Sequence, residues 1–219
     1  MDIDIFFNGK NVKAALALPA SKTGPGVLVL HAWWGLNPFF KALCDRLAAQ
    51  GFVALAPDLN NGEVARTIDE AAALMERRDD QAMHDTILAA RDFLLDHSAV
   101  NSQKIGLIGF SMGAAWSLVA ASAAPEKVAA VVLFYGGPGV DVRKIQAKVL
   151  GHFCEVDEWE PIEGIQDMQK SMADAGLDAT IHIYPGLKHW FFEDNRPEFD
   201  PRSAELAWER SLAFLKENL

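Results

Sequence analysis

The chain has 219 residues, of which 50% are hydrophobic and 23% are charged. This composition is too apolar for a disordered chain, and the length suits a single domain with a substantial core. Thirty Asp and Glu residues against 20 Lys and Arg give a formal net charge of −10. A phosphate backbone would therefore be repelled, and nucleic-acid binding is not expected.

Two cysteines, Cys44 and Cys154, are too few for a disulfide framework in a chain of this length. The N-terminus is acidic and lacks the basic start of a secretory signal, and no apolar run approaches the roughly 20 residues that span a bilayer. The sequence therefore predicts a cytoplasmic protein without a membrane partner. No zinc, phosphate-loop or dinucleotide motif is present, so no metal or cofactor is expected. The oligomeric state stays open between monomer and dimer.

Short β-rich runs alternate with longer helical runs along the chain. The predicted strands are 2–7, 12–19, 27–31, 52–57, 104–110, 128–135, 148–153 and 179–184, with a turn at 8–11. The predicted helices are 38–50, 63–97 with a break near 78–80, 112–124, 161–175 and 201–218. This alternation predicts an α/β fold, in which helices cover both faces of a mostly parallel sheet, as one domain of residues 1–219.

The string Gly109-Phe110-Ser111-Met112-Gly113 is a G-x-S-x-G pattern between a predicted strand and a predicted helix. So tight a turn strains its central residue, requires small residues at 109 and 113, and lifts the Ser111 hydroxyl above the sheet. The alternative is a Gly/Ser turn that only joins two core elements, but such a turn does not need glycine on both sides. Ser111 is therefore the candidate nucleophile.

A serine nucleophile needs a base, usually a histidine oriented by a carboxylate, and in this architecture the chain order is Ser, acid, His. Three histidines follow Ser111. His152 and His182 lie inside predicted strands, where burial or a solvated face is the simpler interpretation. His189 follows the strand 179–184 in a loop at the C-terminal edge of the sheet, where catalytic residues gather. His189 is favoured as the base, with a hydrogen-bonded loop histidine as the alternative.

The acid is expected in the loop after the strand 148–153. Four acidic residues crowd that loop: Glu155, Asp157, Glu158 and Glu160. Asp157 is preferred, although composition does not choose between the four.

Several segments together resemble the dienelactone hydrolase family of α/β-hydrolases. They are residues 29–37, 48–59, 108–114, 155–157, 184–189, 195–201 and 207–208. By this resemblance the family's catalytic triad falls on Ser111, Asp157 and His189. The resemblance also implies an oxyanion hole built from the backbone N–H groups of Met112 and Trp33. It implies an α/β-hydrolase fold without a large lid, acting on a small ester or lactone.

Three positions depart from the family pattern. The namesake enzymes have cysteine where this chain has Ser111 and glutamate where it has Ala32. They carry a substrate-carboxylate arginine where this chain has Glu193, which is expected to repel such a carboxylate. The resemblance therefore carries over the fold and the triad, but not the dienelactone substrate itself.

Four aromatic residues near the predicted active edge are candidates for an acyl pocket, with packing beneath the loops as the alternative. They are Trp34, Trp159, Trp190 and Phe191. His31 is interpreted either as a brace for the oxyanion loop or as a buried structural histidine.

The predicted function is a serine esterase or lactonase that works through an acyl-enzyme. A thioesterase or small-amide hydrolase on the same triad remains an alternative. A non-catalytic binding protein on a hydrolase scaffold is the alternative from a different class.

Overall fold

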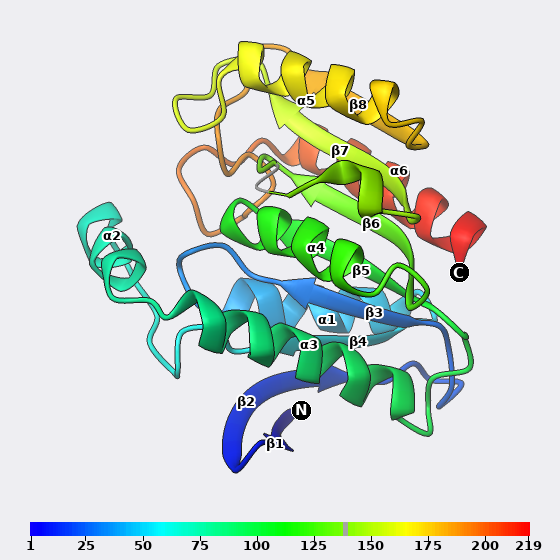
Figure 1. The fold of residues 1–219 in the computed structure, drawn as a ribbon. Coiled ribbons are helices and arrows are strands. Elements are labelled where there is room, and N and C mark those ends of the chain that lie inside the picture. The colour runs from blue at the N-terminus through cyan, green and yellow to red at the C-terminus, as the bar shows by residue number, and fades with distance from the viewer. Residues whose placement is uncertain (138–139) are drawn as a thin grey trace. The chain divides into compact units, whose positions relative to one another are not determined.

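The computed structural model of the chain describes residues 1–137 and 140–219 (Figure 1). The chain forms two compact units, Met1–Leu107 and Ile108–Leu219, and the division falls within strand β5 (Ile105–Phe110). The single domain expected from the sequence stays a prediction.

The first unit contains strands β1 (Asp2–Phe7), β2 (Lys10–Ala17), β3 (Gly26–Leu30) and β4 (Val53–Pro57), in the order β1-β2-β4-β3. β2 pairs antiparallel with both β1 and β4, whereas β3 and β4 are parallel. Every residue of β3 and β4 is buried, as expected for apolar strands covered on both faces.

The turn between β1 and β2 is shorter than predicted. Asn8 and Gly9 have φ values of 47° and 73°, and β2 begins at Lys10. A two-residue turn with positive φ at both positions matches the twist of a hairpin, so the strands pair up to the turn itself.

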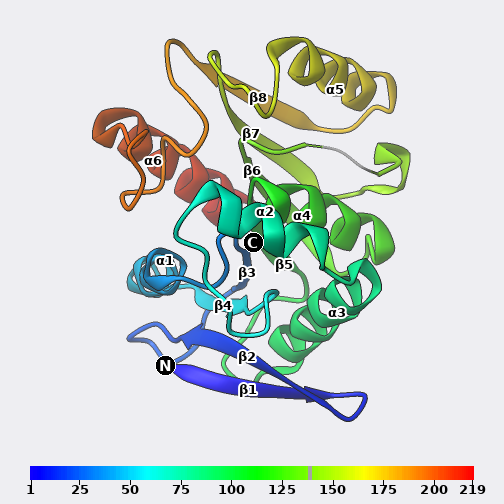
Figure 2. The same cartoon turned by 90° about the vertical axis from the view of Figure 1, so that its left-hand side faces the viewer.

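The helices of the first unit are α1 (Pro38–Ala49), α2 (Ile68–Glu76) and α3 (Asp80–Asp96), and α1 and α3 lie on opposite faces of the strands (Figures 1 and 2). The predicted helical start at residue 63 is wrong. The Thr67 hydroxyl accepts a hydrogen bond from the Glu70 N–H (3.2 Å), and the Glu70 carboxylate accepts one from the Arg66 N–H (2.7 Å). This reciprocal cap begins the helix at Ile68.

The second unit contains the end of β5, followed by β6 (Val128–Phe134), β7 (Lys148–Cys154) and β8 (Ala179–Tyr184), in the order β5-β6-β7-β8. β7 is parallel to both β6 and β8. Its helices are α4 (Met112–Ala123), α5 (Ile162–Asp174) and α6 (Pro201–Asn218), with a short 3-10 turn at Val142–Lys144 that was not predicted.

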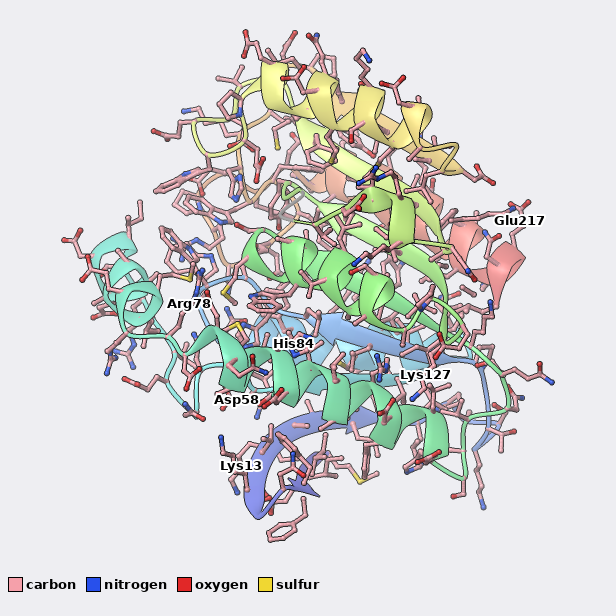
Figure 3. All side chains as sticks on the ribbon, in the orientation of Figure 1. Lys13, Asp58, Arg78, His84, Lys127 and Glu217 are labelled. Carbon is pink, nitrogen blue, oxygen red and sulfur yellow. The ribbon has the colours of Figure 1, made fainter. Side chains whose placement is uncertain are left out.

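Helices α4 and α6 contact β6 from opposite sides (Figure 2). The mostly parallel α/β architecture is thereby confirmed. Charged side chains such as Lys13 and Glu217 project from the surface (Figure 3). Among the described residues, no helix combines the length and apolar character needed to cross a membrane.

Candidate active site

Ser111 occupies the turn between β5 and α4, with φ 51° and ψ −113°. A serine rarely adopts positive φ, so surrounding contacts must hold this backbone in place. The Ser111 N–H donates to the Phe134 carbonyl oxygen (2.9 Å), and the Ser111 carbonyl oxygen accepts from the Ala114 N–H (2.9 Å). These hydrogen bonds tie the turn to the end of β6 and to the first turn of α4.

Two glycines make room for this turn. A Cβ atom on Gly109 would overlap the Gly113 carbonyl oxygen and the Ser117 hydroxyl, and one on Gly136 would overlap the Ser111 carbonyl. The predicted need for a small residue at 109 therefore has a direct steric cause. Gly136 was not singled out in the sequence, because its partner lies in another strand–loop connection.

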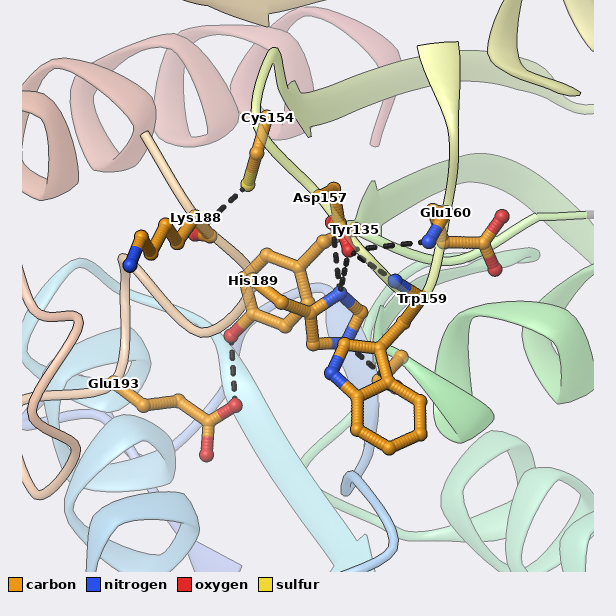
Figure 4. A network of polar contacts seen from close by, with 9 residues as sticks. Tyr135, Cys154, Asp157, Trp159, Glu160, Lys188, His189 and Glu193 are labelled. Carbon is orange, nitrogen blue, oxygen red and sulfur yellow. Dashed lines mark hydrogen bonds and ion pairs between the residues drawn. The ribbon is translucent and has the colours of Figure 1, made fainter. Parts of the chain in front are cut away.

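The three residues chosen as the triad lie in contact within the second unit. His189 Nε2 is 3.0 Å from Ser111 Oγ. His189 Nδ1 is 2.8 Å and 3.0 Å from the two Asp157 carboxylate oxygens (Figure 4). The side chains of His189 and Asp157 are 4% and 0% exposed. Asp157 Oδ1 also accepts from the backbone N–H groups of Trp159 (2.9 Å) and Glu160 (3.1 Å).

The loops after β7 and β8 bring Asp157 and His189 together. The Val156 N–H donates to the Leu187 carbonyl (3.0 Å), and the Gly186 N–H donates to the Glu155 carboxylate (2.8 Å). Glu155 thus has a structural partner of its own. Glu158 is exposed, and burial raises the pKa of Glu160. Of the four acids that the sequence left open, only Asp157 contacts the histidine within the described hydrogen bonds.

The predicted pocket residues differ in exposure. Trp159 is 43% exposed, and its ring centroid lies 6.4 Å from that of His189. The Trp190 ring meets His189 edge-on at 4.9 Å but is only 4% exposed, and Phe191 is fully buried. Trp159 is therefore the one of these three that offers a substantial exposed surface beside the histidine.

Tyr135 and Glu193 lie beside the histidine in an arrangement that the sequence did not predict. Both are fully buried, and the Tyr135 hydroxyl donates to Glu193 Oε1 at 2.7 Å (Figure 4). Burial raises the pKa of Glu193 to about 8, so this carboxyl is mostly protonated at pH 7. The expected repulsion of an anionic substrate by Glu193 is corrected accordingly, because the group is neither exposed nor mainly charged.

Three further predicted residues, His31, Trp33 and Trp34, lie in the first unit. Trp34 is fully buried, with its ring 5.4 Å from that of Trp33. Buried His31 accepts the Leu59 N–H at Nε2 (3.0 Å) and donates from Nδ1 to the Ala32 carbonyl (2.6 Å). It therefore joins the loops that follow β3 and β4. The oxyanion role of the Trp33 N–H stays a prediction.

His152 and Cys154, also in the second unit, have hydrogen-bond partners other than Ser111 and His189. His152 is buried between the Tyr184 hydroxyl (2.9 Å) and the Ser211 hydroxyl (3.0 Å), and burial lowers its pKa well below the usual value. His182 stacks on His152. The Cys154 thiol donates to the Lys188 carbonyl (3.0 Å), and burial raises its pKa strongly.

Comparison with known proteins shows the family to which this chain belongs. The sequence model of the dienelactone hydrolase family matches residues 12–219. Protein usf of Aquifex pyrophilus is 36% identical, over 97% of this chain and 96% of its own length. An Aquifex aeolicus protein with the provisional name carboxymethylenebutenolidase is 32% identical, over 97% of this chain and 96% of its own.

Comparison with solved structures supports the same family. The crystal structure of a Klebsiella pneumoniae protein, provisionally described as a dienelactone hydrolase, superposes with a TM-score of 0.90 at 25% identity, covering 99% of this chain and 98% of that one. Both the sequence match and the structural match extend over nearly the whole chain. The chain therefore belongs to the dienelactone hydrolase family, has its α/β-hydrolase fold, and is an enzyme of the ester and lactone hydrolase class.

Proposed function

We propose that this enzyme cleaves small esters or lactones with Ser111 as nucleophile, His189 as base and acid, and Asp157 as the group that orients the histidine. The observation that carries the proposal is the continuous contact from Ser111 Oγ to His189 Nε2 (3.0 Å) and from His189 Nδ1 to Asp157 (2.8 Å). A neutral serine hydroxyl gains nucleophilicity only when a base accepts its proton as the new bond forms.

In the first step, Ser111 Oγ bonds to the substrate carbonyl carbon while His189 Nε2 takes the serine proton. Asp157 accepts the hydrogen bond of Nδ1–H, which leaves the Nε2 lone pair free for that proton and stabilises the imidazolium. The tetrahedral intermediate then expels the leaving oxygen, which receives the proton from Nε2, and an acyl-Ser111 ester remains.

In the second step, a water molecule adds to the acyl carbon and gives its proton to His189. Expulsion of Ser111 Oγ, with return of the proton, releases the carboxylic acid and restores the enzyme. The burial of Asp157 and His189 supports this scheme, since charges that form in a water-poor site interact more strongly.

The oxyanion formed in both steps needs hydrogen-bond donors. Met112 is the first residue of α4, and a helix has no internal acceptors for its first N–H groups. One such donor is typically worth about 3 kcal/mol of transition-state stabilisation. The Trp33 N–H, in the first unit, remains the second donor expected from the family resemblance.

We also propose that the substrate is uncharged. A hollow of about 450 Å³ beside Asp157 is lined by Glu155, Glu158 and Glu163, with Lys188 as its cation. The family's carboxylate-binding arginine is replaced by buried Glu193, which supplies no positive charge. An anionic substrate would meet three glutamates against a single lysine at this rim, which disfavours its binding.

A fluorophosphonate probe tests the nucleophile. We expect stoichiometric labelling of wild type at Ser111, and no labelling of a folded Ser111→Ala variant. A panel of neutral esters, lactones, thioesters and amides, each run with Ser111→Ala beside wild type, then separates the ester or lactone function from the alternatives. Folded wild type that neither reacts with the probe nor turns over an ester would overturn the proposal.

A further inference from the structure

Tyr135 lies directly against the histidine of the candidate triad. It follows β6, has a φ of 37°, and its N–H donates to the His152 carbonyl (2.8 Å). Its ring centroid is 4.7 Å from that of His189, with an angle of 55° between the ring planes. The Tyr135 ring therefore packs against the imidazole, which the Trp190 ring also contacts edge-on.

Glu193 holds the far end of this tyrosine. The Glu193 N–H donates to the Trp190 carbonyl (2.9 Å), so the turn that carries His189 also carries the carboxyl group. Glu193 Oε1 accepts the Tyr135 hydroxyl, and within the described residues Oε2 has no hydrogen-bond partner. Tyr135 is thus fixed at its backbone by β7 and at its hydroxyl by the turn after His189 (Figure 4).

The surroundings of Glu193 favour its neutral form. Desolvation is the largest influence on its pKa and raises it, and the charges of Glu198 and Asp194 act in the same direction. The Tyr135 hydrogen bond and the charge of Arg196 act in the opposite direction but do not outweigh burial. A buried carboxylate with one unpartnered oxygen would be costly, whereas a protonated carboxyl still accepts the phenol hydrogen bond.

We propose that Tyr135 and Glu193 act as a positioning pair, which holds the imidazole of His189 in line with Ser111 and Asp157. The inference rests on the proposed triad and adds two residues that touch neither substrate nor the reacting atoms. Proton transfer requires Nε2 to stay within hydrogen-bond reach of Oγ, and a displacement of about 1 Å can lower the rate about a hundredfold.

The chain contains only two tyrosines, which provides a matched pair of variants. Tyr135→Phe removes the hydroxyl that Glu193 accepts. Tyr184→Phe removes another buried hydroxyl of the second unit, which contacts His152 (2.9 Å) and Arg210 (3.2 Å) and neither Ser111 nor His189. Both variants lose one tyrosine hydroxyl, and Tyr184→Phe loses two hydrogen bonds where Tyr135→Phe loses one, so a general loss of stability is at least as large in the control.

The experiment measures kcat and KM on a neutral ester, together with the rate of fluorophosphonate labelling. For Tyr135→Phe we expect kcat and the labelling rate to fall by about tenfold or more, while KM changes by less than about twofold. Tyr184→Phe should stay within about twofold of wild type. Glu193→Gln keeps an uncharged acceptor for the phenol and should retain most of the wild-type activity, whereas Glu193→Met should lose it.

Each outcome bears on a different claim. The pair is overturned if Tyr135→Phe is as active as Tyr184→Phe, or if Glu193→Gln is as impaired as Glu193→Met. If Tyr135→Phe does not fold, the comparison of Glu193→Gln with Glu193→Met decides alone. If Ser111→Ala keeps both labelling and hydrolysis, the proposed nucleophile fails, and that result is independent of every Tyr135 and Glu193 variant.

Discussion

The Nε2 atom of His189 lies 3.0 Å from the Oγ atom of Ser111, although 78 positions separate the two residues along the chain. Ser111 follows β5, and His189 lies in the loop after β8. Carboxyl ends of parallel strands meet at one edge of a sheet, so residues distant in sequence converge there. The geometry is that of a base poised to take a hydroxyl proton.

Replacing Asp157 with asparagine should lower kcat by about 10⁴-fold with little change in KM. The asparagine amide would donate to Nδ1 and so favour the tautomer that has its proton on Nε2, which cannot accept the serine proton. Steady-state kinetics on a neutral ester measure the effect. Exposed Glu158→Gln is the control, as it removes a neighbouring charge without touching His189. An Asp157→Asn enzyme within tenfold of wild type would exclude Asp157 as the orienting acid.

Replacing Gly109 with alanine should destabilise the fold by several kcal/mol, because the added methyl overlaps the Gly113 carbonyl and the Ser117 hydroxyl. Gly164→Ala is the matched control. It lies in helix α5 with nothing within 4 Å of the new Cβ, so we expect it to be neutral or stabilising by up to about 1 kcal/mol. Urea unfolding measures both. Equal stability of the two variants would contradict the close packing of the nucleophile turn.

The arrangement of the candidate site could be predicted from the sequence wherever a local pattern carried the information. The glycines around Ser111, the Ser, acid, His order and the loop position of His189 each follow from a nearby strand or turn. Choosing Asp157 over its acidic neighbours required the family resemblance, because the four carboxylates differ only in their contacts after folding. The Tyr135–Glu193 contact joins residues 58 positions apart and leaves no periodic signal in either segment. The start of α2 depends on the cap formed by Thr67 and Glu70, and polar side chains of this kind do not contribute to a hydrophobic pattern.

Stability should depend on pH through Glu193. Its pKa rises from an ordinary value of 4.5 to about 8 on folding. The stabilising contribution of the protonated group is therefore complete below about pH 4.5 and is lost as pH rises toward 8, at a slope approaching about 1.4 kcal/mol per unit. The glutamine of Glu193→Gln does not titrate, so only wild type loses this contribution as the pH rises. The unfolding free energy of Glu193→Gln minus that of wild type should therefore increase steadily between pH 5 and pH 8.

Urea titrations at half-unit pH intervals provide this measurement. Exposed Glu217→Gln serves as the control, since it makes the same chemical change at the protein surface and should leave the pH dependence of wild type unaltered. A constant difference between wild type and Glu193→Gln across the range would show that Glu193 has no raised pKa.

Substrate charge should affect turnover through the acidic rim beside Asp157. We expect a neutral ester to have a higher kcat/KM than a half-ester of the same length that ends in a carboxylate, and added salt should narrow the difference. Glu158→Lys should favour the anionic ester selectively. Glu217→Lys, which makes the same charge change in the last turn of α6, should not. An anionic ester preferred by wild type would refute the uncharged-substrate proposal.

Neither cysteine should serve as a nucleophile. Cys44 and Cys154 are buried, and burial raises the pKa of Cys44 to about 12 and that of Cys154 further still, so almost no thiolate forms at pH 7.5. Iodoacetamide should leave the native enzyme active and unlabelled but modify both thiols after unfolding. The Ser111→Cys variant is the positive control, because its thiol would lie beside His189 and should react rapidly. Inactivation of native wild type by alkylation of Cys154 would instead place thiol chemistry at the site, and Ser111 would lose its exclusive role.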